Sequence, residues 1–295
     1  MFIIQERKMS ILEIKGLTKE LNKFILNNIN LELPKGYVLG YVGQNGAGKT
    51  TTIKLITEQY KHDIGTIRIN GLLYHENPIV YKSAIGYVAD ECYFPSDFTV
   101  DMIESTLSDC YYSFNKNKFE NYLKRWNLPK GKKIREFSKG MKVRLMFTTV
   151  LSRETQILIL DEATSGLDPV VRKEIIQLIQ EYVSDGEKSV LFSTHIMDDL
   201  EAIADYIYFI NNGQMVLKGV KDELLEEFVV VKGGINDLTK ELKKRLIGIQ
   251  QSSISFEGLL KSKNLEFTNN RIIVEKATIN QIIIFYIEHM GVKSI

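Results

Sequence analysis

The chain has 295 residues, 44% of them hydrophobic, and a formal net charge of only +1 at pH 7. This length can bury one large core and leave a smaller appendage. The balanced charge gives no reason to expect nucleic acid as a main partner. The apolar runs fall far short of the roughly 20 residues that cross a bilayer, and residues 1–8 do not resemble a signal peptide. With two isolated cysteines, Cys92 and Cys110, we expect a soluble chain in a reducing compartment.

In chain order, the first part of the sequence is rich in short strands. Residues 11–14, 28–33 and 66–69 alternate apolar and polar positions, which predicts a small antiparallel sheet. Residues 37–42 are a continuous β-rich apolar run, whereas residues 51–56 carry helical spacing. A strand that turns directly into a helix is therefore expected near residue 45.

The stretch between that strand and that helix fits G-x-x-x-x-G-K-[ST], the pattern of a phosphate-binding loop. Its residues are Gly43, Gln44, Asn45, Gly46, Ala47, Gly48, Lys49 and Thr50, and Thr51 follows as a further candidate contact. Glycines let the backbone curl so that its N–H groups and the helix N-terminus point at the phosphates of a nucleotide. Lys49 is predicted to reach the β- and γ-phosphates, and the Thr50 hydroxyl to bind Mg²⁺. The alternative is a glycine-rich turn with a chance lysine.

Helices and buried strands alternate through the middle of the chain. Residues 98–128 are helical and aromatic, and residues 142–153 form another predicted helix. Residues 157–160 and 189–193 are continuous apolar strands, each followed by a helical pattern. This alternation predicts a parallel, doubly wound sheet.

Asp161 and Glu162 directly follow one of these buried strands. A buried carboxylate is costly unless it binds a cation, so Asp161 is predicted to hold Mg²⁺. The carboxyl ends of parallel strands face the ligand crevice, which would let Glu162 orient or deprotonate an attacking water. An isolated Asp-Glu pair would more often be surface charge, but the phosphate-binding loop in the same chain favours a catalytic site.

Together with further segments in the expected order, these motifs resemble the ATP-binding cassette (ABC) ATPases over residues 11–219. The further segments are Phe137-Ser138-Lys139-Gly140-Met141, Ser165-Gly166-Leu167-Asp168 and Ser193-Thr194-His195. The resemblance implies an α/β P-loop NTPase fold with a parallel sheet core, an antiparallel β subdomain and a helical subdomain. It also implies that two cassettes, identical or different, sandwich two ATP molecules head to tail. They would drive a membrane permease on a separate chain, at the cytoplasmic face of the membrane.

The same resemblance implies roles for individual residues. Ser138 and Gly140 would contact the γ-phosphate of the ATP that the partner cassette holds. His195 would hold the γ-phosphate of the chain's own ATP and join Glu162 as a catalytic residue, although a lone histidine after a strand is often only a core residue. Asp168 would line the seam between cassettes, or serve only as a turn and helix cap.

Three features depart from the family pattern. Lys139 and Met141 replace the first glycine and the glutamine of the usual Ser-Gly-Gly-Gln. Asp90 stands where a glutamine usually acts on Mg²⁺ or the attacking water, so it is a metal-site candidate that would need a bridging water. The aromatic residue that usually stacks on adenine aligns with Leu21, and Phe24 is close by; both are candidate base contacts.

Two further regions are left with open roles. Residues 91–98 are rich in aromatic side chains, which suit either a permease contact or the core of the helical subdomain. Beyond residue 220 the pattern changes: residues 228–231 and 272–274 are predicted strands, and Thr278 to Gln281 is a capping box that opens an amphipathic helix. We therefore predict an ABC ATPase domain at residues 1–220 and a small α+β accessory domain at residues 221–295.

Two other functions remain alternatives at this stage. The first is an ABC ATPase without a transport role, against which stand the single phosphate-binding loop, the lack of a long coiled-coil insertion and the lack of a basic face. The second is a regulatory module that binds ATP and hydrolyses it weakly, which the departures at Asp90 and Lys139 favour. The presence of Glu162 and His195 argues against it.

Overall fold

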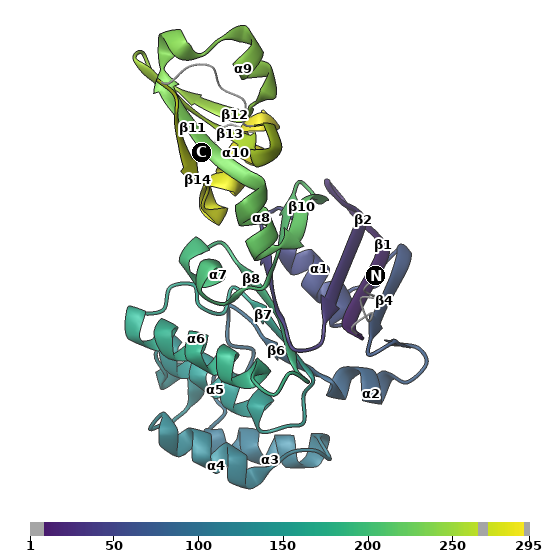
Figure 1. The fold of residues 1–295 in the computed structure, drawn as a ribbon. Helices are drawn as coiled ribbons and strands as arrows, with labels where there is room; N and C mark the ends of the chain where they lie inside the picture. Colours follow the sequence, from purple (N-terminus) through teal and green to yellow (C-terminus); the bar gives the residue numbers. More distant parts are fainter. Residues whose placement is uncertain (1–8, 265–270, 292–295) are drawn as a thin grey trace, which may run out of the picture. The chain divides into compact units, whose positions relative to one another are not determined.

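The computed structural model describes residues 9–264 and 271–291, which form two compact units (Figure 1). The first unit comprises the described residues up to Ala204 together with Ile210–Met215. The second comprises Asp205–Phe209 and the described residues from Val216 onward.

Membrane-spanning segments were not expected from the sequence. Within the two described stretches of the chain, no helix is both long enough and apolar enough to cross a bilayer. The segment on which the signal-peptide expectation rests, residues 1–8, lies outside the described residues.

An antiparallel sheet in the first unit has the strand order β2-β1-β4-β5. Its strands are β1 (Ser10–Leu21), β2 (Phe24–Pro34), β4 (Ile64–Ile69) and β5 (Leu72–Leu73). A two-residue turn joins β1 to β2, with Asn22 at a φ of 37°, and places Leu21 opposite Phe24 at the end of the hairpin. The predicted antiparallel sheet is therefore confirmed, with longer strands than the alternating pattern indicated.

The other sheet of the first unit supplies the edge at which the site forms. Its strand order is β10-β9-β3-β8-β7-β6. Strands β9 (Tyr206–Asn211) and β10 (Gln214–Val220) belong to the first unit only in the residues Ile210–Met215. The parallel strands are β3 (Val38–Val42), β8 (Ser189–Thr194), β7 (Ile157–Asp161) and β6 (Ile85–Val88). Every residue of β3, β7 and β8 is buried, as expected for strands covered on both faces. The predicted parallel sheet is confirmed, and its carboxyl ends bring the segments after β3, β7 and β8 to one edge.

The helices of the first unit lie between its strands, with α3, α4 and α5 following one another between β6 and β7. They are α1 (Lys49–Ile56), α2 (Pro78–Ser83), α3 (Val100–Cys110), α4 (Lys116–Arg125), α5 (Lys139–Leu151), α6 (Pro169–Val183), α7 (Met197–Ile203) and a 3-10 turn at Ile134–Glu136. Figure 1 shows α3, α4 and α5 gathered together, away from the antiparallel sheet. Helix α5 begins three residues earlier than the predicted range of 142–153, because the Ser138 hydroxyl accepts a hydrogen bond from the Met141 N–H at 3.3 Å and caps the helix there.

The second unit contains a four-stranded antiparallel sheet with the order β12-β13-β11-β14. Its elements are α8 (Lys221–Glu227), β11 (Phe228–Gly234), α9 (Lys240–Arg245), β12 (Ile247–Gln251), β13 (Ser255–Lys261), β14 (Ile273–Lys276), α10 (Ile279–His289) and 3-10 turns at Ile235–Asp237 and Ser262–Asn264. The strand predicted at residues 228–231 is confirmed as part of β11. Of the strand predicted at residues 272–274, the last two residues are confirmed, since β14 begins at Ile273. Strands β12 and β13 and helix α9 were not predicted.

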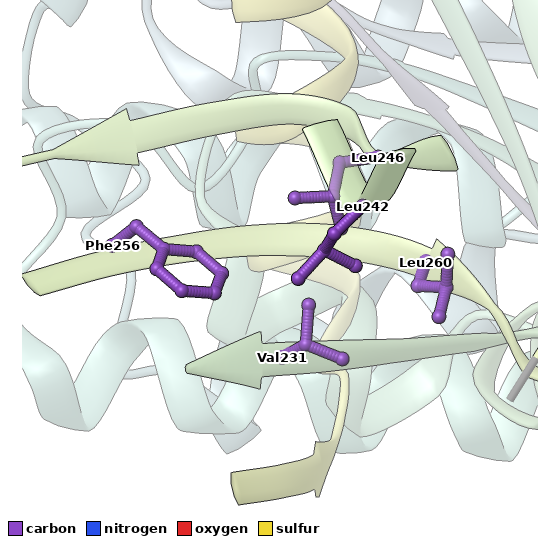
Figure 2. Packing of buried hydrophobic residues seen from close by; sticks show 5 residues of the cluster. All are labelled: Val231, Leu242, Leu246, Phe256 and Leu260. Carbon is purple, nitrogen blue, oxygen red and sulfur yellow. The ribbon is translucent and has the colours of Figure 1, made fainter. Parts of the chain in front are cut away.

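Helices cover both faces of this second sheet. On one face, Leu242 of α9 packs with Val231, Leu246, Phe256 and Leu260 in a buried cluster (Figure 2). On the other face, the ring of Phe228 meets Tyr286 of α10 edge to face, with centroids 5.9 Å apart. Phe228 and Val231 point to opposite faces because side chains alternate along a strand. The second unit therefore has a core of its own.

Helix α10 begins at the predicted capping box. The Gln281 N–H donates to the Thr278 hydroxyl at 3.2 Å, and the Thr278 N–H donates to Oε1 of Gln281 at 3.0 Å. The predicted apolar stripe is buried at Ile279, Ile282, Ile283 and Ile287, together with Phe285. Met290, which the stripe was expected to include, is 40% exposed. The stripe therefore serves the core of the second unit and ends one turn earlier than predicted.

Candidate functional site

The phosphate-binding loop connects β3 to α1, as predicted, and its glycines are required by close packing. Gly48 has a φ of 116°, and a Cβ added there would lie 2.9 Å from the ring of Phe24. A Cβ at Gly43 would lie 2.5 Å from the backbone oxygen of Ile210. Side chains do not fit at such distances, so both positions need glycine.

Lys49 folds back over the loop that precedes it. Its ammonium donates to the backbone oxygens of Gly43 at 2.6 Å and Gln44 at 3.3 Å, and lies 3.2 Å from Oε1 of Glu162. The side chain is only 5% exposed. A buried ammonium requires such partners, and here it is held where it can also meet an anion above the loop.

A cavity of about 400 Å³ opens over this loop, within the usual size range of small-molecule sites. It is lined by Leu21, Phe24, Gln44, Asn45, Gly46, Gly48, Lys49, Thr50, Thr51 and Glu162. The two base-contact candidates of the β1–β2 hairpin therefore border the same space as the phosphate-binding loop. Of the loop residues outside this lining, Gly43 contributes its carbonyl to Lys49, and Ala47 is buried.

Asp161 and Thr50 form an oxygen-rich corner beside the loop. The Thr50 hydroxyl donates to Oδ1 of Asp161 at 3.3 Å, and Asp161 is buried at the end of β7. Burial raises the pKa of Asp161, and the hydrogen bond from Thr50 partly opposes this shift. Oxygen donors of this kind fit Mg²⁺, which usually takes one or two carboxylates and completes its shell with phosphate and water. The described residues hold no cluster of three or more His, Cys, Asp or Glu side chains suited to a metal.

Glu162 lies between Lys49 and His195. Its Oε2 is 2.6 Å from Nδ1 of His195, while its Oε1 faces the Lys49 ammonium. The backbone of Glu162 has a φ of 54°, unusual for a residue with a side chain, and its N–H donates to the Ser193 oxygen at 2.9 Å. The structure thus brings the two catalytic candidates into direct contact, at the edge where β7 and β8 end.

Ser138 and Gly140 lie outside the cavity over the phosphate-binding loop. Ser138 caps α5, and Gly140 lies in its first turn, where a Cβ would come within 3.5 Å of Val171. This separation agrees with the expectation that they contact nucleotide held by another cassette, but it does not test that expectation.

Asp168 caps helix α6. Its Oδ1 accepts hydrogen bonds from the backbone N–H groups of Val170 at 3.1 Å and Val171 at 3.0 Å. The helix-cap interpretation of Asp168 is therefore confirmed. A place at the seam between two cassettes stays a prediction.

Asp90 does not line the cavity that Thr50 borders. Its Oδ1 lies 2.8 Å from the Nζ of Lys139, and both residues line a second cavity of about 400 Å³. The two residues at which this chain departs most in charge from the family pattern are therefore partners of each other.

The aromatic segment at residues 91–98 combines internal packing with exposure. Tyr93 stacks on Tyr87 and contacts Phe94, with ring centroids 6.3 Å and 4.7 Å apart, and its hydroxyl donates to the Tyr87 oxygen at 3.1 Å. Tyr93 is nevertheless 47% exposed, and Phe98 is also exposed. Tyr93 thus both packs against neighbouring rings and faces outward, and a permease contact stays a prediction.

The sequence analysis missed Asp199, a buried residue of α7. Its carboxylate accepts hydrogen bonds from the Thr164 hydroxyl at 2.7 Å and from Nε of Arg172 at 2.5 Å. These contacts join the segment after β7 to α6 and α7, and so stabilise the region that carries Glu162. The sequence held only a weak indication that Asp199 is buried. It lies four residues before Ile203, and residues at this spacing share one side of a helix.

Comparison with known proteins agrees with this site. A family model described as ABC transporter matches residues 26–165, which include the phosphate-binding loop, Asp161 and Glu162. The chain is 32% identical over 247 residues to the ABC-type transporter ATP-binding protein EcsA of Bacillus subtilis (strain 168), across 81% of this chain and 99% of that protein. It is 32% identical over 209 residues to the bacitracin transport ATP-binding protein BcrA of Enterococcus faecalis, across 70% and 68% of the two chains.

Solved structures show the same fold. The ATP-binding subunit of an ABC transporter superimposes with a TM-score of 0.66 at 26% sequence identity, covering 72% of this chain and 91% of that chain. The fold and site thus define an ABC-type ATPase. The chain belongs to the ABC transporter family, among its ATP-binding subunits.

Proposed function

We propose that this chain binds Mg-ATP in the cavity over the phosphate-binding loop and hydrolyses it with Glu162 as the general base. The observation that carries the proposal is the contact of Glu162 with both Lys49 and His195 at the border of that cavity. A carboxylate placed there can accept the proton of an attacking water. The phosphate-binding loop borders the same cavity and would hold the ATP beside this carboxylate.

Lys49 has a second role in this proposal. Its ammonium neutralises Glu162, and the phosphates of ATP would compete with that carboxylate for the same charge. The N–H groups at the start of α1 add donors directed at the phosphates. ATP binding would then free the carboxylate of Glu162 from Lys49 and leave it in contact with Nδ1 of His195. The His195 ring can donate to the γ-phosphate at the same time only when both of its nitrogens carry a proton.

Thr50 and Asp161 would hold Mg²⁺ through a hydroxyl and a carboxylate oxygen. Bound Mg²⁺ neutralises charge on the phosphate oxygens. Leu21 and Phe24 would contact the adenine base from the β1–β2 hairpin, where both line the cavity. Of the two, the ring of Phe24 is suited to stacking.

A magnesium titration tests this function. Asp161→Asn is expected to lower the ATP hydrolysis rate at least about tenfold and to raise the Mg²⁺ concentration needed for half-maximal activity, because a charge-assisted contact is worth ~1.5–3 kcal/mol. Phosphate release measured against Mg²⁺ concentration gives both values. Asp109→Asn, at an exposed position of α3, is the matched control and should change neither. An unchanged Mg²⁺ dependence in Asp161→Asn would remove Asp161 from the metal site.

At the level of assembly, we propose that two cassettes enclose ATP between them and act on a separate permease at the cytoplasmic face of the membrane. Ser138 and Gly140 would contact the nucleotide of the other cassette. The exposed rings of Tyr93 and Phe98 offer an apolar surface for the permease. Either a second copy of this chain or a different cassette can complete the sandwich.

We also propose that the ATPase domain ends near residue 220 and that residues 221–295 form an accessory domain. Truncation after Gly219 is expected to leave a folded cassette with unchanged ATP affinity, because all residues proposed to contact ATP precede that point. The buried cluster that includes Val231 and Phe256 lies entirely in the removed segment. Thermal unfolding with and without ATP, together with gel filtration, measures the result. Aggregation or loss of ATP binding would place the domain boundary elsewhere, whereas loss of pairing alone would make the tail an assembly element.

A further inference from the structure

The pair formed by Asp90 and Lys139 joins two motif segments that are far apart in the sequence. Asp90 follows β6, and Lys139 is the first residue of α5, 49 positions later. Their charged atoms are 2.8 Å apart, with the side chains 48% and 46% exposed. Each residue replaces an uncharged one in the family pattern. The negative charge of Asp90 and the positive charge of Lys139 therefore compensate each other.

The Lys139 side chain also lies beside a third motif segment. A Cβ added at Gly166 would lie 3.4 Å from Nζ of Lys139 and 3.9 Å from its Cδ and Cε. Gly166 has a φ of 64° and lies in the turn between Glu162 and the Asp168 cap of α6. The end of the Lys139 side chain, which binds Asp90, therefore also fills the space in which a side chain at Gly166 would lie.

The helix on which Lys139 lies makes an acidic partner important. The N-terminus of a helix carries a partial positive charge, so a lysine at its first position is unfavourable by itself. The first turn of α5 contains no acidic residue of its own. Lys142 adds another positive charge to the cavity that Asp90 lines. Asp90 thus brings negative charge to the start of α5 from a different segment, in addition to Glu91 beside it.

We propose that Lys139 is a positioning residue that, through its ion pair with Asp90 and its place beside the turn at Gly166, fixes the start of α5 for contact with the ATP of a second cassette. The inference rests on the proposed function, in which Ser138 and Gly140 make that contact. Asp90 acts here through Lys139. Neither residue lines the cavity over the phosphate-binding loop, so the pair affects the pairing of cassettes and turnover, and leaves ATP binding to the single chain unchanged.

A double-mutant cycle with the neutral substitutions Asp90→Asn and Lys139→Met tests the pair. Each single variant is expected to lower kcat about two- to fivefold, which corresponds to the upper part of the range of coupling measured for exposed ion pairs. The double variant should be no slower than the slower single variant, because the same interaction is lost in both. In the Glu162→Gln background, the protein concentration needed for ATP-dependent pairing should rise by a similar factor, while the ATP affinity of the monomer stays within about twofold.

A variant with exchanged charges and a control ion pair show whether the effect depends on the pairing of Asp90 with Lys139. Asp90→Lys combined with Lys139→Asp should restore part of the activity lost by Lys139→Asp alone. The matched control is the ion pair of Asp97 and Arg135, which is also 2.8 Å long and exposed but involves the 3-10 turn at Ile134–Glu136 and not the first residue of α5. Neutral substitutions of Asp97 and Arg135 should leave both kcat and pairing unchanged.

Two outcomes of these experiments would contradict the proposal. Additive losses in the double variant would mean that Lys139 acts without Asp90, for example by touching a phosphate itself. Full activity in Asp90→Gln would mean that Asp90 serves as the family's glutamine does and that its charge toward Lys139 is dispensable. Either result overturns the proposal.

Cross-linking separates this inference from the proposed function. A water-soluble carbodiimide condenses a carboxylate with a neighbouring amine, and mass spectrometry of the wild-type chain should identify an amide between Asp90 and Lys139. If the chain hydrolyses ATP and this cross-link is absent, the pair is wrong while the function stands. If the cross-link forms and the wild-type chain does not hydrolyse Mg-ATP, the proposed function fails while the pair stands.

Discussion

Glu162→Gln is expected to slow ATP hydrolysis by about 100-fold or more while ATP binding is kept. The amide has nearly the same size as the carboxylate but cannot accept a proton from the attacking water, and general base catalysis typically contributes at least this factor. The substitution also removes the carboxylate that pairs with the Lys49 ammonium at 3.2 Å. The phosphates of ATP then meet less competition for that charge, so the affinity should stay equal or rise.

The rate of phosphate release and an equilibrium binding titration measure the two effects separately. Glu181→Gln, which changes an exposed carboxylate paired with Arg125, is the matched control and should behave as wild type. Since bound ATP is no longer consumed, it should hold two cassettes together in gel filtration. Hydrolysis within about threefold of wild type would assign the base to another group. A monomer in the presence of ATP would show that the natural partner is a different cassette.

Lys49→Ala is expected to weaken Mg-ATP binding by about 10- to 150-fold, since a charge-assisted contact contributes roughly 1.5–3 kcal/mol. The loss has two sources. The phosphates lose a cation held by the oxygens of Gly43 and Gln44, and Glu162 is left as an uncompensated, largely buried charge that repels them.

Isothermal titration with Mg-ATP measures this loss, and thermal unfolding without nucleotide checks that the variant is folded. Lys49→Met keeps the stem that packs over the loop and should show the same loss with less effect on stability. Lys61→Ala changes an exposed lysine beyond α1 and should bind ATP as wild type does. Wild-type affinity in a folded Lys49→Met would contradict the assignment of the phosphate-binding loop.

Several elements of the fold and site were predictable because their signals lie close together along the chain. The loop from Gly43 to Thr50 depends on a strand and a helix that directly flank it. The burial of Asp161 at the end of β7 agrees with the sequence pattern, and it made Asp161 a candidate metal ligand because a buried carboxylate is costly without a partner. The capping box that opens α10 is likewise a local pattern, since Thr278 and Gln281 are three residues apart.

Other elements escaped prediction because their signals depend on distant residues. Strands β12 and β13 are short, and each becomes a strand only by pairing with its neighbours in the second sheet. Asp199 is buried in α7 because Thr164 and Arg172 satisfy it, and neither of them is near it in the sequence. Propensity and periodicity along the chain contain no information on such partners.

The amino-acid sequence by itself determined where the phosphate-binding loop and the buried strands lie and to which family the pattern belongs, because loops, caps and strand ends form between near neighbours. The tertiary structure alone decided how the charges are paired. Glu162 contacts Lys49 and His195, and Asp90 contacts Lys139, across separations that only the packing of strands and helices closes. Ion pairs act over a few ångströms in space, whatever the distance along the chain, so their partners become visible only after the chain has folded.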